Sequence, residues 1–238
     1  MPSAPKWLFD TVDLLMPKLP SMHVEDTVLL SPFIKKISFK GSFDKLTLPV
    51  GASIDFRVSD TQARRYTVSH ADIANGLLEC IVHLHGDGIG QQFMDNLKKG
   101  DKIDLNKPRG ERKYYDRSAA RFLIFGDETS LGLACSFFPV LKQSNQPFQF
   151  YFELDEENKN VPAVLGLEHY TVFPKNEVFR NEARVSELPV IQATGWQRSN
   201  FVLTGNVRSA QTFRKVIKEK TEGKVYLHGY WLEGKKGL

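Results

Sequence analysis

The first half of the chain alternates apolar and polar residues over short stretches, a pattern typical of β-strands. Residues 54–58 alternate one by one, as a strand with one buried face does. Comparable strands are predicted at residues 34–39, 65–69, 77–84 and 102–105. A short helix over 91–97 interrupts the series. About six short strands with a single helix predict a small antiparallel barrel.

The second half follows a different period, with strands and helices in alternation. Short apolar runs predict strands at residues 121–125, 148–154, 170–173, 201–204 and 224–227. One helix is predicted over 131–141, and another over 209–220 with Ser209 as N-cap and Phe213, Val216 and Ile217 facing inward. Alternating strands and helices predict a parallel sheet covered by helices. The predicted fold class is therefore all-β plus α/β.

Length and composition agree with two folded domains. The chain has 238 residues, 41% of them hydrophobic and 25% charged, which is ordinary for a globular protein. A charged stretch at residues 111–117 separates the two patterns. We therefore expect a helical extension at residues 1–20, a barrel domain at 21–114 and an α/β domain at 115–238.

Charge, cysteine content and the N-terminal pattern narrow the classes of function. A net charge of +4 is too weak to indicate a nucleic-acid partner, but it is compatible with an anionic ligand. Cys80 and Cys135 lie in apolar stretches without a CxxC motif, so we expect two reduced thiols and no metal site. Residues 1–20 lack the pattern of a signal peptide, and no apolar run is long enough to cross a bilayer. The expectation is a cytoplasmic protein without a membrane partner.

A first segment suited to a nucleotide cofactor reads Arg64-Arg65-Tyr66-Thr67-Val68. Alternate residues of a strand share a face, so Arg64 and Tyr66 are expected to point the same way. A flavin needs a cation for its phosphates, a flat aromatic wall and a short donor near its reactive N5 atom. Arg64, Tyr66 and Thr67 can supply these groups. The structural alternative is a surface arginine pair beside a half-buried tyrosine.

A second segment, residues 85–93, places Gly86, Gly88 and Gly90 between a strand and a helix. Glycines let the backbone approach a ligand closely, and the free N–H groups at a helix start favour a phosphate. The spacing differs from that of the GxGxxG dinucleotide motif. A glycine-rich loop without a ligand is the alternative.

Two further segments are Pro-Arg-Gly at 108–110, equally compatible with a simple turn, and Gly-Asp-Glu-Thr-Ser at 126–130. The latter follows an apolar strand, so it lies at the carboxyl end of a sheet, where nucleotides bind in open α/β folds. Because carboxylates repel a phosphate, Asp127 is also a candidate helix cap, which leaves Thr129 and Ser130 as donors.

The order Arg-x-Tyr-Thr, His-Gly-Asp-Gly, Pro-Arg-Gly and Gly-Asp-Glu-Thr, followed by Gly-Tyr-Trp at 229–231, resembles that of the siderophore-interacting proteins. These are flavoproteins of the ferredoxin-reductase-like superfamily, and the resemblance runs from about Val24 to the C-terminus. It implies a six-stranded antiparallel flavin-binding barrel followed by a parallel-sheet NAD(P)-binding-like domain. It further implies FAD as cofactor, NAD(P)H or reduced ferredoxin as electron donor, and ferric siderophores reduced in the cytoplasm to release Fe(II).

The resemblance also assigns residues to roles. Tyr66 and Thr67 are the expected catalytic pair. The expected cofactor-binding residues are Arg64, Tyr66, Thr67, Val68, His83, His85, Asp87, Gly88, Gly90, Gln91, Gln92 and Trp231. The expected nicotinamide-nucleotide residues are Gly126, Asp127, Glu128, Thr129 and Ser130. Lys235 and Lys236 are candidates for a basic rim that attracts the anionic siderophore, with an ordinary solvated tail as the alternative.

The chain departs from the family pattern at three places. Gln91 stands where many members have a serine, and Ser130-Leu131-Gly132 replaces the usual Ala-Leu-Pro. Thr204-Gly205-Asn206 stands where a more acidic Gly-Glu turn is expected. These changes weaken the assignment of the nicotinamide-nucleotide residues more than the assignment of the flavin-binding residues. Two other functions therefore stay open: a general ferredoxin-reductase-type flavoprotein that passes electrons to a protein partner, and a non-catalytic module that has lost its flavin. A monomer is expected.

Overall fold

The computed structural model describes residues 5–7, 10–11, 22–42, 46–86, 88–103, 110 and 114–235. The chain divides into two compact units, Met1–Arg112 and Lys113–Leu238. This division lies at the charged stretch where the sequence pattern changes. Each unit has a sheet and a hydrophobic core of its own.

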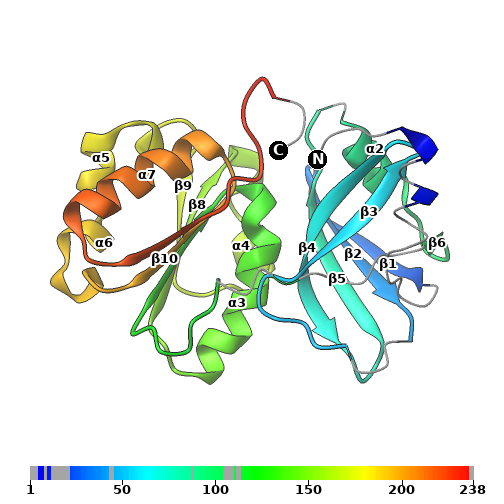
Figure 1. Ribbon diagram of the computed structural model, residues 1–238, viewed down its shortest axis with the longest axis horizontal. Coiled ribbons are helices and arrows are strands. Elements are labelled where there is room, and N and C mark those ends of the chain that lie inside the picture. The colour runs from blue at the N-terminus through cyan, green and yellow to red at the C-terminus, as the bar shows by residue number, and fades with distance from the viewer. Residues whose placement is uncertain are drawn as a thin grey trace. The chain divides into compact units, whose positions relative to one another are not determined.

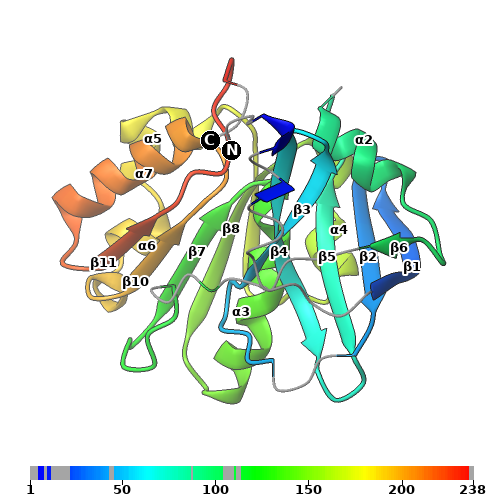
Figure 2. The same cartoon turned by 45° about the vertical axis from the view of Figure 1, so that its right-hand side comes forward.

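The first unit contains a six-stranded sheet in the order β3-β4-β5-β2-β1-β6, with antiparallel neighbours throughout (Figure 2). The elements are β1 Met22–Ser31, β2 Ile34–Lys40, β3 Ser53–Ser59, β4 Gln62–Asp72, β5 Leu77–His83, α2 Ile89–Asn96 and β6 Lys102–Ile103. This antiparallel half-barrel sheet confirms the predicted β domain.

Strand β1 has no counterpart among the predicted strands. Register shifts between Val24 and Asp26, and between Leu29 and Ser31, interrupt its pairing with β2. Each irregularity changes which residues face the core, so the strand lacks the strict period of two that identified the others.

Strand β4 pairs along different parts of its length with two neighbours. Residues 62–67 pair with β3, and residues 68–72 pair with β5 after a bulge that follows Val68. Such a bend lets one sheet wrap around a single core. That core includes Phe39 and Phe56, which are fully buried.

The second unit contains a parallel five-stranded sheet in the order β11-β10-β7-β8-β9 (Figure 1). Its strands are β7 Phe122–Gly126, β8 Phe148–Leu154, β9 Tyr170–Pro174, β10 Asn200–Leu203 and β11 Lys224–Leu227. Its helices are α3 Leu131–Gln143, α4 Val161–Val164, α5 Glu182–Ser186, α6 Pro189–Gln192 and α7 Val207–Lys220, with short 3-10 turns at Glu128–Ser130, Glu156–Asn158, Val178–Arg180 and Thr194–Trp196. The predicted α/β domain is confirmed.

Helices cover both faces of this parallel sheet. Phe125 of β7 packs on Phe213 of α7, with ring centroids 5.4 Å apart. Phe122 of the same strand packs on Phe137 of α3 at 5.8 Å. Figure 1 shows α5, α6 and α7 on one side of the sheet and α3 on the other. Burial on both faces explains why these strands read as continuous apolar runs.

Helices α2 and α7 begin two residues earlier than predicted, whereas α3 begins at Leu131 as predicted. The N-cap of α7 is Asn206, whose side chain accepts a hydrogen bond from the Arg208 N–H at 2.9 Å, whereas Ser209 is buried in the first turn. Asn and Ser are about equally good caps, so composition did not decide between them. Helix α2 begins at Ile89, next to Gly88.

The remaining expectations for the chain concern its start and its cysteines. Within residues 1–20, helical residues are described at 6–7 and 10–11, and the rest lies outside the described residues. Cys80 is buried and Cys135 is half-buried, and neither cysteine forms a disulfide. No helix in the described part of the chain is long and apolar enough to span a membrane.

Candidate functional site

A close contact in the first unit joins strand β4 to the glycine turn that follows β5. Gly90, the second residue of α2, lies against Arg64 and Tyr66 of β4. A Cβ at Gly90 would be 2.7 Å from Arg64 Cγ and 3.0 Å from the Tyr66 hydroxyl. Only glycine permits this approach, because any larger residue would push the two side chains away. Arg64 and Tyr66 therefore lie together beside the turn.

The two neighbouring arginines of β4 have different surroundings. Arg64 is half-buried and donates to the Ala63 carbonyl and to Gln62 Oε1, each at 2.8 Å. No acidic side chain among the described residues pairs with it. Arg65 instead grips the buried carboxylate of Asp55 with two hydrogen bonds, of 2.8 and 3.1 Å. Arg64 thus keeps its positive charge available for an anion, while Arg65 neutralises Asp55.

Tyr66 is held in the core with its hydroxyl directed at the glycine turn. Its ring packs edge-on against Phe56, with centroids 5.6 Å apart. Burial raises the pKa of Tyr66 well above its ordinary value, and this outweighs the opposite effect of Arg64. The phenol therefore stays protonated and can donate a hydrogen bond. Thr67 is half-buried next to it, whereas Val68 is buried in the core.

The N-terminus of α2 presents backbone N–H groups that no described side chain caps. Gly88 precedes the helix, and no described side chain caps it. Gly86 has a φ of 69°, a left-handed conformation that glycine adopts without strain. Gln91 is half-buried, and its Oε1 atom is buried without a hydrogen-bond partner among the described residues. Gln92 is exposed, and its N–H returns to the Gly88 carbonyl at 3.0 Å.

The histidines of this segment lie together at the end of β5. The rings of His83 and His85 have centroids 4.9 Å apart and planes inclined by 37°. His83 is half-buried and His85 is exposed. Asp87 lies outside the described residues, as does most of the Pro-Arg-Gly segment.

One residue that sequence analysis missed anchors α2 to the sheet. Lys35 of β2 is buried, and its Nζ donates to the carbonyls of Met94, Asp95 and Leu97 at 3.1, 2.7 and 3.1 Å. The last carbonyls of a helix have no partners within it, and a cation also complements the helix dipole there. Burial lowers the pKa of Lys35, and Asp95 partly opposes this effect. The available signal was the position of Lys35, two residues before the core residue Ile37 and therefore on the same face of β2.

We predict that Lys35→Met lowers the free energy of unfolding by about 2 kcal/mol, because it leaves the carbonyls at the end of α2 without their donor. Urea denaturation measures the change. The matched control is Lys36→Met, because Lys36 forms only a partly exposed ion pair with Glu79 at 3.4 Å and should change stability by less than about 1 kcal/mol. Equal effects of the two substitutions would contradict the anchoring role.

The residues of the first unit fit a phosphate-bearing flavin. Arg64 provides a cation that no described carboxylate pairs with, the start of α2 provides backbone donors, and Tyr66 provides an aromatic wall. The Gln91 side chain adds a buried polar atom that still lacks a partner among the described residues. These groups come from two separate segments that the Gly90 contact brings together.

The Gly-Asp-Glu-Thr-Ser segment of the second unit follows β7, which lies between β8 and β10. The chain leaves β7 towards one neighbour and later returns to the other, so this is the point of the sheet where ligands bind in open α/β folds. Gly126 is buried, and a Cβ there would be 2.2 Å from Ser130 Cβ. Thr129 donates its N–H to Asp127 Oδ1 at 2.9 Å, which bears out the predicted cap. Ser130 is buried and accepts from the Thr204 hydroxyl at 2.8 Å.

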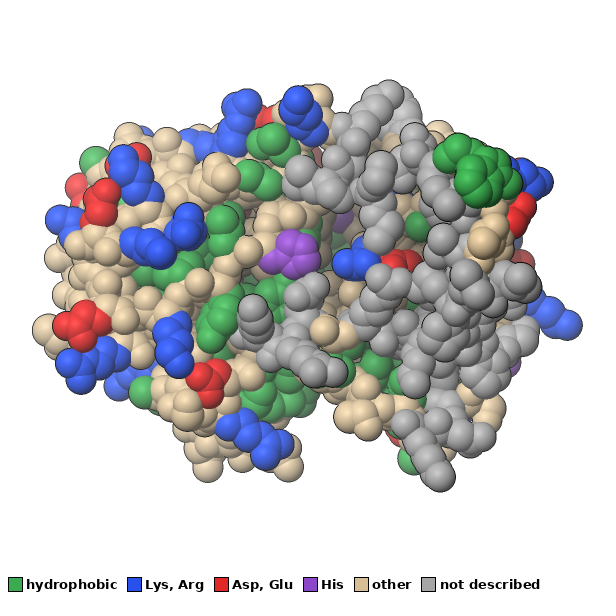
Figure 3. All heavy atoms as spheres, viewed as in Figure 1, with side chains coloured by type: hydrophobic (Ala, Val, Ile, Leu, Met, Phe, Trp, Pro, Cys, Tyr) green, Lys and Arg blue, Asp and Glu red, His purple; other side chains and the backbone are tan. Residues whose placement is uncertain are grey.

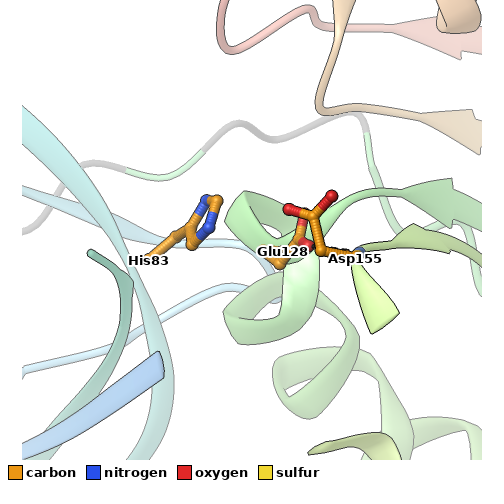
Figure 4. Close-up of side chains that lie close together, drawn as sticks. All are labelled: His83, Glu128 and Asp155. Carbon is orange, nitrogen blue, oxygen red and sulfur yellow. Dashed lines mark hydrogen bonds between the residues drawn. The ribbon is translucent and has the colours of Figure 1, made fainter. Parts of the chain in front are cut away.

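Glu128 is also engaged within its own unit. Its side chain reaches the segment that begins at Asp155, as Figure 4 shows, and Oε1 accepts from the Asp155 N–H at 2.8 Å and from the Asn158 amide at 3.1 Å. Lys175 forms ion pairs with Glu128 at 2.8 Å and with Asp155 at 2.6 Å. Burial alone would lower the pKa of Lys175, but the two carboxylates outweigh it and raise that pKa. Glu128 therefore ties β7 to β8 and β9.

Glu153 of β8 is a buried carboxyl group that the sequence did not single out. It is 3% exposed, and its Oε1 has no hydrogen-bond partner among the described residues. Burial raises its pKa to about 7, with Asp127 adding to the rise and Ser209 and Arg180 opposing it. The folded state thus binds this proton more tightly than the unfolded chain does.

The pKa of Glu153 predicts that ionisation of this group destabilises the fold as the pH rises from about 4.5 to about 7. Glu153→Gln removes this cost, so its free energy of unfolding should exceed that of the parent by about 3 kcal/mol at pH 8 and by little at pH 4.5. Urea denaturation at both pH values measures this difference. Glu157→Gln, at an exposed position, is the control and should show no such pH dependence. A gain for Glu153→Gln that is equal at both pH values would contradict the prediction.

The C-terminal candidates lie at the end of the second unit. Trp231 is half-buried and forms an isolated bridge with Asn206, while Lys235 is exposed and Lys236 lies outside the described residues. Basic side chains of this unit form ion pairs such as Lys215–Glu182 at 2.8 Å and Arg180–Glu233 at 2.8 Å. On the face that Figure 3 shows, Lys and Arg side chains over α5–α7 alternate with acidic ones and do not form a single patch.

Comparison with known sequences finds two matches, each to part of the chain. Residues 21–114 match the family model of the oxidoreductase FAD-binding domain. A stretch of 97 residues is 30% identical to the electron transfer subunit of the NAD(+)-type dihydroorotate dehydrogenase B from Fusobacterium nucleatum. This match covers 39% of the chain and 37% of that relative.

Solved structures extend the likeness to both units. The siderophore-interacting protein SipS from Aeromonas hydrophila matches with a TM-score of 0.73 and 19% identity, over 93% of this chain and 94% of that chain. Phthalate dioxygenase reductase matches with a TM-score of 0.71 and 14% identity, over 89% of this chain and 68% of that chain. Residues 21–114 therefore match the oxidoreductase FAD-binding domain, and the chain has the fold shared by siderophore-interacting proteins and ferredoxin-reductase-like proteins.

Proposed function

We propose that the protein is an FAD-dependent reductase of ferric siderophores that acts in the cytoplasm and releases Fe(II). The observation that carries the proposal is the contact of Gly90 with Arg64 and Tyr66, which brings a cation, an aromatic wall and the start of a helix to one place. Fold likeness to a siderophore-interacting protein over 94% of its length supports the choice of substrate. NAD(P)H or reduced ferredoxin is the proposed electron donor.

The roles of the residues follow from their chemistry. Arg64 and the first N–H groups of α2 would hold the phosphates of FAD, since a cation and the N-terminus of a helix both favour anions. Tyr66 would contact the flavin ring, and Thr67 would donate a hydrogen bond near its reactive edge. Trp231 is a further proposed contact of the ring, and Lys235 and Lys236 would attract an anionic siderophore. When bound, FAD would supply the redox chemistry, the acceptance of an electron pair from the donor and its passage one electron at a time to two ferric ions.

The visible spectrum of the purified protein tests the first part of this proposal. A flavin spectrum is expected, together with the mass of FAD for the released cofactor. Anaerobic mixing with NADH, NADPH or reduced ferredoxin should bleach the colour and identify the donor, and a ferric siderophore should restore it. A colourless protein that does not take up added FAD would contradict the proposal and favour a non-catalytic module that has lost its flavin. If no ferric chelate reoxidised the reduced flavin, ferric siderophores would be excluded as the substrate.

A second candidate is electron transfer to a protein partner. It is favoured by the sequence match to an electron transfer subunit and by the fold of phthalate dioxygenase reductase, whose structure is described as one for electron transfer from pyridine nucleotides to [2Fe-2S]. Reoxidation of the reduced protein by a redox protein but not by ferric siderophores would favour this candidate.

We propose that the protein is a monomer, and size-exclusion chromatography with light scattering tests this oligomeric state.

A further inference from the structure

The C-terminal aromatic segment is fixed to the carboxyl edge of the second unit's sheet. The Tyr230 N–H donates to the Gly205 carbonyl at 2.8 Å, and the Val207 N–H donates to the Trp231 carbonyl at 3.0 Å. Asn206 and Trp231 form a parallel bridge. The segment therefore lies along the turn that joins β10 to α7. These bonds fix the backbone of Trp231 but leave its side chain to other contacts.

The side chain of Trp231 is held by Asp127. Its indole Nε1–H donates to Asp127 Oδ2 at 2.6 Å. The same oxygen accepts from the Asn206 N–H at 2.8 Å, and the other oxygen accepts from the Thr129 N–H and hydroxyl. Both oxygens of Asp127 thus accept hydrogen bonds from groups of its own unit. The residue is 3% exposed. Hydrogen bonds to an ionised carboxylate are roughly twice as strong as neutral ones.

The turn at Gly205 packs directly against the carboxylate of Asp127. Gly205 has a φ of 80°, and a Cβ there would be 2.7 Å from Asp127 Cγ and 2.9 Å from its backbone nitrogen. The turn after β10 thus approaches the turn after β7 so closely that a side chain at position 205 would clash with Asp127. A carboxylate already engaged in this way has no lone pair directed outward for another donor. Its negative charge also opposes an anion at the same turn.

We infer that Asp127 is a positioning residue for Trp231 rather than a ligand of the electron donor. One carboxylate joins the turn after β7, the N-terminus of α7 and the C-terminal aromatic segment. The orientation of the indole therefore depends on the ability of Asp127 to accept two hydrogen bonds at Oδ2. The contact of Trp231 with flavin rests on the proposed function, but the link between Asp127 and Trp231 does not.

Single-tryptophan fluorescence tests the link directly. In a Trp7→Phe/Trp196→Phe background the emission comes from Trp231 alone, and Asp127→Asn replaces an acceptor oxygen with an NH₂ group that cannot serve both donors. We expect a red-shifted emission and a rise of about two-fold or more in the acrylamide quenching constant, because the indole loses its charge-assisted bond. Asp155→Asn is the matched control, since Asp155 begins the segment after the adjacent strand β8, and it should leave the emission unchanged. An unshifted emission in a folded Asp127→Asn protein would overturn the inference.

A measurement without substitution of Asp127 covers the case in which that variant does not fold. In the same two-tryptophan-deleted background, the indole N–H resonance of Trp231 should exchange with water at least about ten-fold more slowly than that of a free indole, because its proton is held by a buried carboxylate. Exchange as fast as that of free tryptophan would refute the link. Both measurements are made without FAD, so a failure of FAD to bind would contradict the proposed function and leave this inference intact.

Discussion

Arg64→Ala should weaken FAD binding by about 10-fold to 100-fold while leaving the fold intact. Arg64 is the half-buried cation beside Gly90, and its charge is not neutralised by any described carboxylate. A charge-assisted hydrogen bond to a phosphate is worth about 1.5–3 kcal/mol, and each 1.4 kcal/mol is a factor of ten in affinity. Titration of the apoprotein with FAD, followed by quenching of flavin fluorescence, measures the dissociation constant.

The neighbouring arginine provides a control of opposite character. Arg65→Ala leaves the buried carboxylate of Asp55 without its bidentate partner, so it should lower the free energy of unfolding by about 2–3 kcal/mol. Its FAD affinity, measured where the protein is folded, should stay within about two-fold of the parent, since Arg65 already serves Asp55. If Arg65→Ala lost FAD and Arg64→Ala kept it, the face of β4 assigned to the cofactor would be the wrong one.

Gly205→Ala should lower the free energy of unfolding by at least about 4 kcal/mol. Its φ of 80° costs about 1 kcal/mol for a residue with a Cβ. That Cβ would also lie 2.7 Å from Asp127 Cγ and 2.9 Å from the Asp127 backbone nitrogen, so the two turns must separate. Their separation breaks the bonds of Asp127 to Asn206 and Trp231, each worth about 1.5–3 kcal/mol when one partner is charged. Chemical denaturation measures the loss.

Gly166→Ala separates backbone strain from the steric effect. Gly166 has a φ of 70°, but no atom lies within 4 Å of a Cβ placed there. The substitution should therefore cost only about 1 kcal/mol. Comparable losses at Gly166 and Gly205 would mean that strain alone matters and that the contact with Asp127 contributes little.

Much of the fold can be predicted from patterns among neighbouring residues. The strand at residues 54–58 and the helix carrying Phe213 were predicted from periodicity, because the burial of one face repeats every two or 3.6 residues. The parallel strands of the second unit were recognisable as short apolar runs, since both faces are covered. Strand β1 was missed because its register shifts break that repeat.

The candidate site was predictable only in part. Arg64, Tyr66 and the alternating glycines were identified because strand geometry and glycine conformation are properties of neighbouring residues. Lys35 was not identified, because its partners lie about 60 residues away at the end of α2. Nothing local distinguishes a lysine that caps a distant helix from one that faces water.

The two-part organisation, the order of most strands and helices and the segments suited to a nucleotide all follow from the amino-acid sequence. The partners of the charged side chains follow from the three-dimensional fold. It assigned Arg65 to Asp55, Glu128 to Lys175, and Asp127 to Trp231, which lies 104 residues further along the chain. Periodicity is set by neighbouring residues, whereas the partner of a buried charge is set by which distant segments the fold brings within hydrogen-bonding distance.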